Sequence, residues 1–231
     1  MQLHLLSSSG ELFIEDVIEI ARPMLEGISE PEVAYLPAAS LERSYSRETR
    51  AAFRGLTKVT LLKAESDPLK KIKSALDRAA LLYIPGGNTF LMAHRLHNRG
   101  LVDLIRHYLL AGLPMVGVSA GTMICGVNIL TSNDINCCGC VTFSGLNLVP
   151  CNFNMHYPPE EGDSRLDRDD RMGQFLQFHD QPVLAMQDDA YIRVTEAGLE
   201  LVRGTCWRFE KGKEKALLPP GKLASKVLTP R

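Results

Sequence analysis

The chain has 231 residues, of which 45% are hydrophobic, and a formal net charge of -1 at pH 7. That length and apolar content suffice for one domain with a sizeable core, and the near-neutral charge disfavours nucleic acid or an anionic membrane as a partner. No apolar run approaches the roughly 18 residues of a membrane span, and the first residues lack the basic and long apolar regions of a signal peptide. We expect a cytoplasmic monomer or homodimer.

Short apolar runs alternate with amphipathic segments through the first half of the chain. This alternation predicts a parallel sheet with helices on both faces, in which ligands bind beyond the carboxyl ends of the strands. The predicted strands are Leu3–Leu6, Val33–Leu36, Val59–Leu62, Leu81–Ile84 and Met115–Val118, and the predicted helices are Ile14–Leu25, Ser46–Arg54, Leu69–Ala79, Thr89–His97 and Val102–Leu110.

The pattern changes after residue 140 to short strands that are partly antiparallel. We predict an α/β fold with a mostly parallel doubly wound sheet, flanking helices and a short antiparallel C-terminal part. A single domain is expected over residues 1–209, followed by a polar, lysine-rich tail over 210–231. The later strands are predicted at Val141–Phe143, Val183–Met186, Tyr191–Val194, Leu199–Arg203 and Cys206–Phe209.

Six cysteines occupy positions 125, 137, 138, 140, 151 and 206. In a chain without an export signal, free thiols are the expected state. The cluster Cys137-Cys138-Gly139-Cys140 lacks the paired C-x-x-C spacing and the accompanying histidines of a zinc site. The sequence therefore predicts no bound metal, and it assigns no role to these thiols.

The segment Gly117-x-Ser119-x-Gly121 follows a predicted strand and precedes a segment compatible with a helix. This is the sequence form of a nucleophile elbow, a sharp turn that exposes the serine hydroxyl. A helix beginning at Ala120 would direct its free N–H groups at negative charge formed there. The alternative is an ordinary tight turn in which Ser119 only caps the helix.

A serine nucleophile needs a base, and the base needs an orienting acid. Among the six histidines, His156 differs in following a strand-like run and preceding two prolines, a position where loops carry functional residues. It is the candidate base, although a structural loop residue is the competing interpretation. For the acid, Asp188 and Asp189 follow a predicted strand and Asp134 follows the elbow, and the pattern alone does not choose among them.

Several sequence blocks between about residues 80 and 195 occur together in one family, in the same order. The chain resembles serine peptidase family S51, the peptidase E family of α-aspartyl dipeptidases, which have a class I glutamine amidotransferase-like fold. The blocks are Gly86-Gly87-Asn88-Thr89-Phe90, Ser119-Ala120-Gly121, Thr131-x-Asn133-Asp134, Leu146-Asn147-Leu148-Val149-Pro150, Asn154-x-His156-Tyr157 and Arg168-Asp169-Asp170-Arg171-Met172.

The resemblance implies a serine exopeptidase that needs no metal or organic cofactor. It implies Ser119 as the nucleophile and His156 as the base, and it aligns the family's glutamate with Asp188, one methylene shorter. The backbone N–H groups of Gly87 and Ala120 are then the expected oxyanion hole.

The family hydrolyses dipeptides with an N-terminal aspartate, so a small Asp-X peptide is the implied substrate. Arg168 aligns with an arginine of the family and is the expected partner of the aspartate side chain, with Arg171 as a second candidate. Asn88 and Asp134 are also expected to contact substrate. Two alternatives are a cyanophycinase-like peptidase for β-aspartyl bonds and a non-catalytic amidotransferase-like binding protein.

Overall fold

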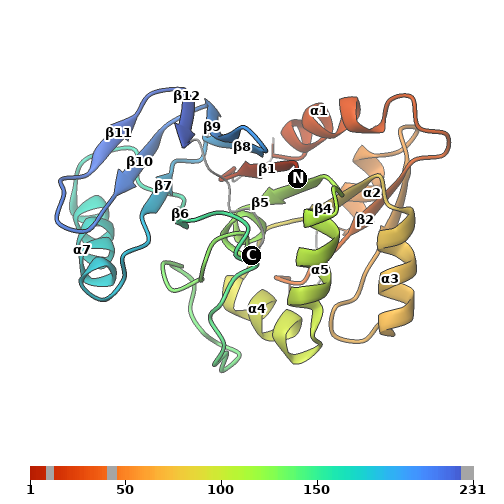
Figure 1. Ribbon diagram of the computed structural model, residues 1–231, viewed down its shortest axis with the longest axis horizontal. Coiled ribbons are helices and arrows are strands. Elements are labelled where there is room, and N and C mark those ends of the chain that lie inside the picture. Colours follow the sequence, from red (N-terminus) through yellow and green to blue (C-terminus); the bar gives the residue numbers. More distant parts are fainter. Residues whose placement is uncertain (9–12, 41–45, 225–231) are drawn as a thin grey trace.

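A computed structural model describes residues 1–8, 13–40 and 46–224 of the chain. In this part the strands form two sheets, one of eight strands in the order β12-β9-β8-β1-β5-β4-β2-β3 and one of four in the order β11-β10-β7-β6. Figure 1 shows the larger sheet between helices and the smaller sheet beside it, with α7 on its outer side.

The larger sheet is parallel from β1 to β3 and continues on the other side of β1 with antiparallel strands. This arrangement confirms the predicted α/β fold with a mostly parallel sheet. Its strands are β1 (Leu3–Leu6), β2 (Glu32–Tyr35), β3 (Lys58–Leu61), β4 (Leu81–Ile84), β5 (Met115–Val118), β8 (Tyr191–Thr195), β9 (Gly198–Arg203) and β12 (Gly221–Ala224).

Both faces of the central parallel strands β4 and β5 are apolar and buried, because helices cover both. In β4, Leu81 and Tyr83 pack in the cluster that contains α1 residues and Phe53, whereas Leu82 and Ile84 pack in the cluster that contains α3, α4 and α5 residues. Side chains alternate between the faces of a strand, so one continuous apolar run serves two cores. The helices are α1 (Phe13–Leu25), α2 (Ser46–Ala52), α3 (Leu69–Arg78), α4 (Thr89–Asn98) and α5 (Leu101–Leu110).

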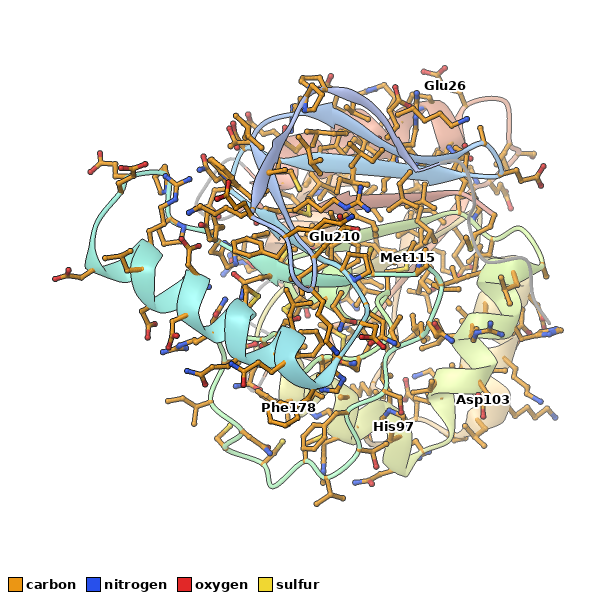
Figure 2. The ribbon with its side chains drawn as sticks, turned by 60° about the vertical axis from the view of Figure 1, so that its left-hand side comes forward. Glu26, His97, Asp103, Met115, Phe178 and Glu210 are labelled. Carbon is orange, nitrogen blue, oxygen red and sulfur yellow. The ribbon has the colours of Figure 1, made fainter. Side chains whose placement is uncertain are left out.

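The smaller sheet joins the larger one through its inner face, where Phe153, Leu184 and Met186 belong to the main core. Its outer face packs against α7 through Met172 and Leu176. Figure 2 shows α7 lying along this side of the molecule, with Phe178 at its carboxyl end. The elements are β6 (Asn152–Met155), α7 (Asp163–Phe178), β7 (Val183–Met186), β10 (Cys206–Phe209) and β11 (Ala216–Leu218).

Two parts of the sequence prediction differ from the structure. Residues 141–143 form no strand, because Val141 is exposed and only an isolated bridge between Asn128 and Ser144 lies nearby. Residues 216–218 and 221–224, predicted to lie in a polar tail, form β11 and β12. These are edge strands held by backbone pairing with β10 and β9, which requires no apolar periodicity. The end of the predicted tail, 225–231, lies outside the described residues.

Within the described ranges, no helix combines the length and apolarity needed to cross a membrane.

Candidate active site

The nucleophile elbow lies between β5 and the short helix α6 (Ala120–Met123). Ser119 has a left-handed backbone with φ +52°, which is unusual for a residue with a side chain and typical of such elbows. A Cβ on Gly121 would lie 2.0 Å from the carbonyl oxygen of Ile84, and one on Gly117 would lie 2.6 Å from the carbonyl oxygen of Gly121. Both flanking glycines are therefore required by the close approach of backbone.

Ser119, His156 and Asp188 form one hydrogen-bonded chain. The Oγ of Ser119 lies 2.8 Å from Nε2 of His156, and Nδ1 of His156 lies 2.5 Å from Oδ1 of Asp188. The strand pairing brings His156 and Asp188 together. Strands β6 and β7 are parallel with Met155 opposite Met186, so both residues lie just beyond the carboxyl ends of adjacent strands.

The hydrogen bonds fix which nitrogen of His156 is available. Because the Asp188 carboxylate can only accept, Nδ1 is the donor of this pair, and in a neutral ring the lone pair of Nε2 then faces the hydroxyl of Ser119. The side chains of His156 and Asp188 are 37% and 53% exposed, so the chain of three groups opens to solvent. This arrangement can accept a proton from Ser119.

The two other candidate acids do not contact His156. The carboxylate of Asp189 accepts a hydrogen bond from the backbone N–H of Thr205, and that of Asp134 accepts from the N–H of Thr89 at the start of α4. Asn88 also serves this helix start, since its side chain accepts from the N–H of Leu91 and donates to the carbonyl of Ile135. Asp134 and Asn88 thus both have structural partners.

The loop after β4 approaches the elbow closely. A Cβ on Gly86 would lie 3.2 Å from Cβ of Ser119, and Gly87 has φ +129°. The N–H of Asn88 donates to the carbonyl of Ala39 and fixes the loop. Among the residues that the structure describes, none accepts a hydrogen bond from the N–H of Gly87 or of Ala120.

Arg168 lies on α7, half-buried beside the strand that leads to His156. Its Nη1 donates to Oδ1 of Asn154 at 3.1 Å and to the carbonyl of Met155 at 3.3 Å. Burial lowers the pKa of the guanidinium, the nearby Arg171 lowers it further, and the carboxylate of Asp134 opposes the shift. No described residue accepts a hydrogen bond from its Nε or Nη2. Arg171, by contrast, is exposed and pairs with Asp167 at 2.9 Å.

A cluster of polar and aromatic side chains joins α7 to the residues after β6 and β10. The hydroxyl of Tyr157 donates to the carboxylate of Asp169, which also accepts from Lys215 at 2.5 Å. The guanidinium of Arg165 lies 4.7 Å from the ring centroid of Trp207. These contacts join the residue after His156 to the helix that carries Arg168. No motif in the sequence indicated this cluster.

The end of β1 also holds the elbow in place, a contact that no sequence motif predicted. The carbonyl of Leu6 accepts hydrogen bonds from the N–H of Ser119 at 2.9 Å and from Oγ1 of Thr122 at 2.8 Å. The pairing of β1 with β5 brings these residues together. The serines that follow the predicted strand Leu3–Leu6 were the available sequence signal.

The thiol of Cys125 donates to the carbonyl of Gly121 at 3.4 Å, and no described hydrogen bond joins a cysteine to Ser119, His156 or Asp188. All six are free thiols, and burial raises the pKa of Cys206 to about 12 and that of Cys125 higher still. In the part of the chain described, no group of three or more histidine, cysteine, aspartate or glutamate side chains is placed to hold a metal ion.

Comparison with known proteins gives one consistent family. The model of peptidase family S51 matches residues 3–202. Peptidase E from a Nostoc species is 30% identical over 230 residues, covering 93% of this chain and 91% of its own. A Drosophila melanogaster protein named "Probable alpha-aspartyl dipeptidase" is 39% identical over 126 residues, covering 53% of this chain and 52% of its own.

The fold has solved counterparts. The crystal structure of a peptidase from an acI-B1 actinobacterium superposes with a TM-score of 0.68 at 19% identity, covering 97% of this chain and 96% of its own. At that identity the likeness concerns the fold.

Proposed function

Because this chain belongs to peptidase family S51 and is a peptidase, we propose that it hydrolyses dipeptides with an N-terminal aspartate by a serine mechanism. The observation that carries the mechanism is the hydrogen bond between Ser119 and His156 at 2.8 Å, backed by Asp188. The aspartyl specificity is supported by Arg168, which contacts the carbonyl of the residue before His156, and by the similarity to the protein named "Probable alpha-aspartyl dipeptidase".

The proposed reaction has two steps. In the first, Oγ of Ser119 attacks the peptide carbonyl carbon while Nε2 of His156 takes the hydroxyl proton, and that proton then passes to the nitrogen of the leaving amino acid. In the second, His156 takes a proton from water, the water oxygen attacks the acyl-enzyme, and the proton returns to Ser119. Asp188 keeps the ring in the required tautomer and stabilises the imidazolium.

The N–H groups of Gly87 and Ala120 are the proposed oxyanion hole. Both groups belong to backbone that is fixed before substrate arrives. The hydrogen bond from Asn88 to Ala39 holds the loop of Gly87, and Ala120 is the first residue of α6. Preorganised donors of this kind stabilise the tetrahedral intermediate more than the bound substrate.

Gly87→Ala is expected to lower kcat by about 100-fold, the usual effect of losing one oxyanion donor. The added Cβ would meet the Ala39 carbonyl oxygen at 2.6 Å, so the loop must move and take the N–H with it. The control is Gly55→Ala, where φ is also positive but nothing lies within 4 Å of the added Cβ. If both variants keep the wild-type kcat, Gly87 is not a donor to the oxyanion.

Arg168 is the proposed partner of the substrate's aspartate side chain. An arginine presents a planar pair of donors that matches a carboxylate, and its Nη1 is already held by Asn154 and Met155. Since burial removes water from the guanidinium, an anionic partner at the free edge is favoured more strongly than at the surface.

The experiment that tests the specificity compares p-nitroanilides of Asp, Asn, Glu, Ala and Leu. Asp and Asn have nearly the same shape and differ in charge, so their ratio of kcat/KM isolates the contribution of the carboxylate. We expect Asp to be strongly preferred. Cleavage of a β-aspartyl dipeptide with no cleavage of any α-linked Asp substrate would instead support the cyanophycinase-like alternative.

Arg168→Ala is expected to lower kcat/KM for the Asp substrate by about 100-fold or more, because a partly buried charge pair loses one partner. The rate with the Leu substrate should change far less. Arg171→Ala is the matched control, since that arginine is exposed and paired with Asp167. An unchanged ratio of Asp to Asn hydrolysis in Arg168→Ala would contradict the assignment.

A further inference from the structure

We propose that Ser7 is a positioning residue that holds His156 in its reactive place. This inference rests on the proposed function, because it assigns a role toward the proposed base. Ser7 follows β1 directly, lies 112 positions before Ser119 in the chain, and is fully buried at 0% exposure.

The hydroxyl of Ser7 makes two hydrogen bonds that link the two sheets. It donates to the carbonyl of Met186 at 3.1 Å, and it accepts from the backbone N–H of His156, also at 3.1 Å. The backbone N–H of Ser7 donates to the carbonyl of Ala190 at 3.1 Å. A single hydroxyl thus joins the end of β1 to the residues that follow β6 and to the end of β7.

His156 needs such support because its backbone is strained. It has φ +56°, a left-handed conformation that side chains disfavour and that persists only where the surroundings enforce it. The neighbouring N–H of Tyr157 donates to the same carbonyl of Met186. Without the Ser7 hydroxyl, the N–H of His156 would lose its acceptor. The strained backbone at His156 would then be less stable relative to an extended conformation.

The same strand end holds the nucleophile. Leu6 accepts from the N–H of Ser119, and Ser7, the next residue, accepts from the N–H of His156. Two consecutive residues therefore set the separation of Ser119 and His156, which belong to elements of different sheets. A displacement of about 1 Å between reacting groups is enough to cost about 100-fold in rate.

The first test is Ser7→Ala, with Ser8→Ala as the matched control. Ser8 is also buried, but its hydroxyl points to Asp16 of α1 at 3.4 Å. We expect Ser7→Ala to lower kcat by about 10- to 100-fold with little change in KM, while Ser8→Ala retains the wild-type kcat. A purely structural loss would lower the melting temperature of both variants without separating their kcat values. Equal kcat values for the two variants would overturn the proposal.

A second pair of variants removes the effect of packing. Ser7→Thr and Ser7→Val introduce side chains of nearly the same shape, and only threonine keeps a hydroxyl. We expect Ser7→Thr to have a kcat at least about 10-fold above that of Ser7→Val. If the two have the same kcat, the hydroxyl of Ser7 does not position His156.

Labelling with a fluorophosphonate separates this inference from the proposed function. The probe bonds to the serine oxygen and releases fluoride, and the reaction needs the serine to be activated by its base. If the wild-type protein is not labelled at Ser119, the proposed mechanism fails. If the wild type is labelled and Ser7→Ala is labelled at the same rate, the mechanism stands and only the role of Ser7 is refuted.

Discussion

Ser119→Ala is expected to lower kcat for the Asp substrate by at least about 10⁴-fold, because the variant has no atom that can form the acyl-enzyme. Binding should persist, since neither Arg168 nor the N–H groups at the elbow change. The melting temperature should stay near that of the wild type, because alanine occupies the same left-handed position at similar cost. The measurements are steady-state kinetics and thermal unfolding of both proteins.

Ser74→Ala serves as the control for this experiment. Ser74 is exposed on α3, and among the described residues its hydroxyl is hydrogen-bonded only to the side chain of Arg78. Its kcat should equal that of the wild type. A Ser119→Ala enzyme that retains a tenth of the wild-type kcat would exclude Ser119 as the nucleophile, whatever its distance from His156.

Asp188→Asn is expected to lower kcat by about 10³-fold or more, the second-largest effect of the series. The asparagine amide can donate to Nδ1 of His156, which would place the ring proton on Nε2, facing Ser119. The base would then have no lone pair toward the hydroxyl. Asp188→Glu should retain more activity than Asp188→Asn, because it keeps the carboxylate. The readout is kcat across the neutral pH range.

Asp189→Asn is the matched control for this substitution. Asp189 is the next residue, and its carboxylate oxygen accepts from the N–H of Thr205, a bond that an asparagine oxygen can also accept. Its kcat should therefore be close to that of the wild type. If Asp189→Asn is as impaired as Asp188→Asn while both proteins remain folded, Asp188 does not orient His156.

The buried parallel strands were the part of the fold most predictable from sequence. Leu81–Ile84 and Met115–Val118 were predicted with the observed bounds, because strands covered on both faces are continuous apolar runs. The helix α7 was not predicted from the sequence, because few apolar side chains, chiefly Met172 and Leu176, mark its buried side. The edge strand β12 was missed because it is short and largely unburied, with Lys222 exposed, so that it has no apolar run to mark it.

The candidate site likewise has a part that local sequence predicts and a part that depends on the fold. Ser119 was proposed as a candidate from a local motif, because an elbow requires glycines at fixed positions around the serine. The choice among Asp134, Asp188 and Asp189 was left open, since it depends on the register of β6 and β7. No local pattern encodes register between strands that are far apart in the chain. For that reason the acceptor of the His156 N–H could be found only from the fold.

The hydrogen bond between Ser7 and His156 joins residues 149 positions apart, and this separation has a consequence for synthesis on the ribosome. At 5–20 residues per second, roughly 7 to 30 s pass between the addition of Ser7 and the addition of His156. For the last 37 residues of that interval, roughly 2 to 7 s, β1, β5 and Ser119 already exist in the growing chain, whereas the base and the acid do not. On the proposed mechanism, the nascent protein therefore has no hydrolytic activity until most of its sequence has been translated.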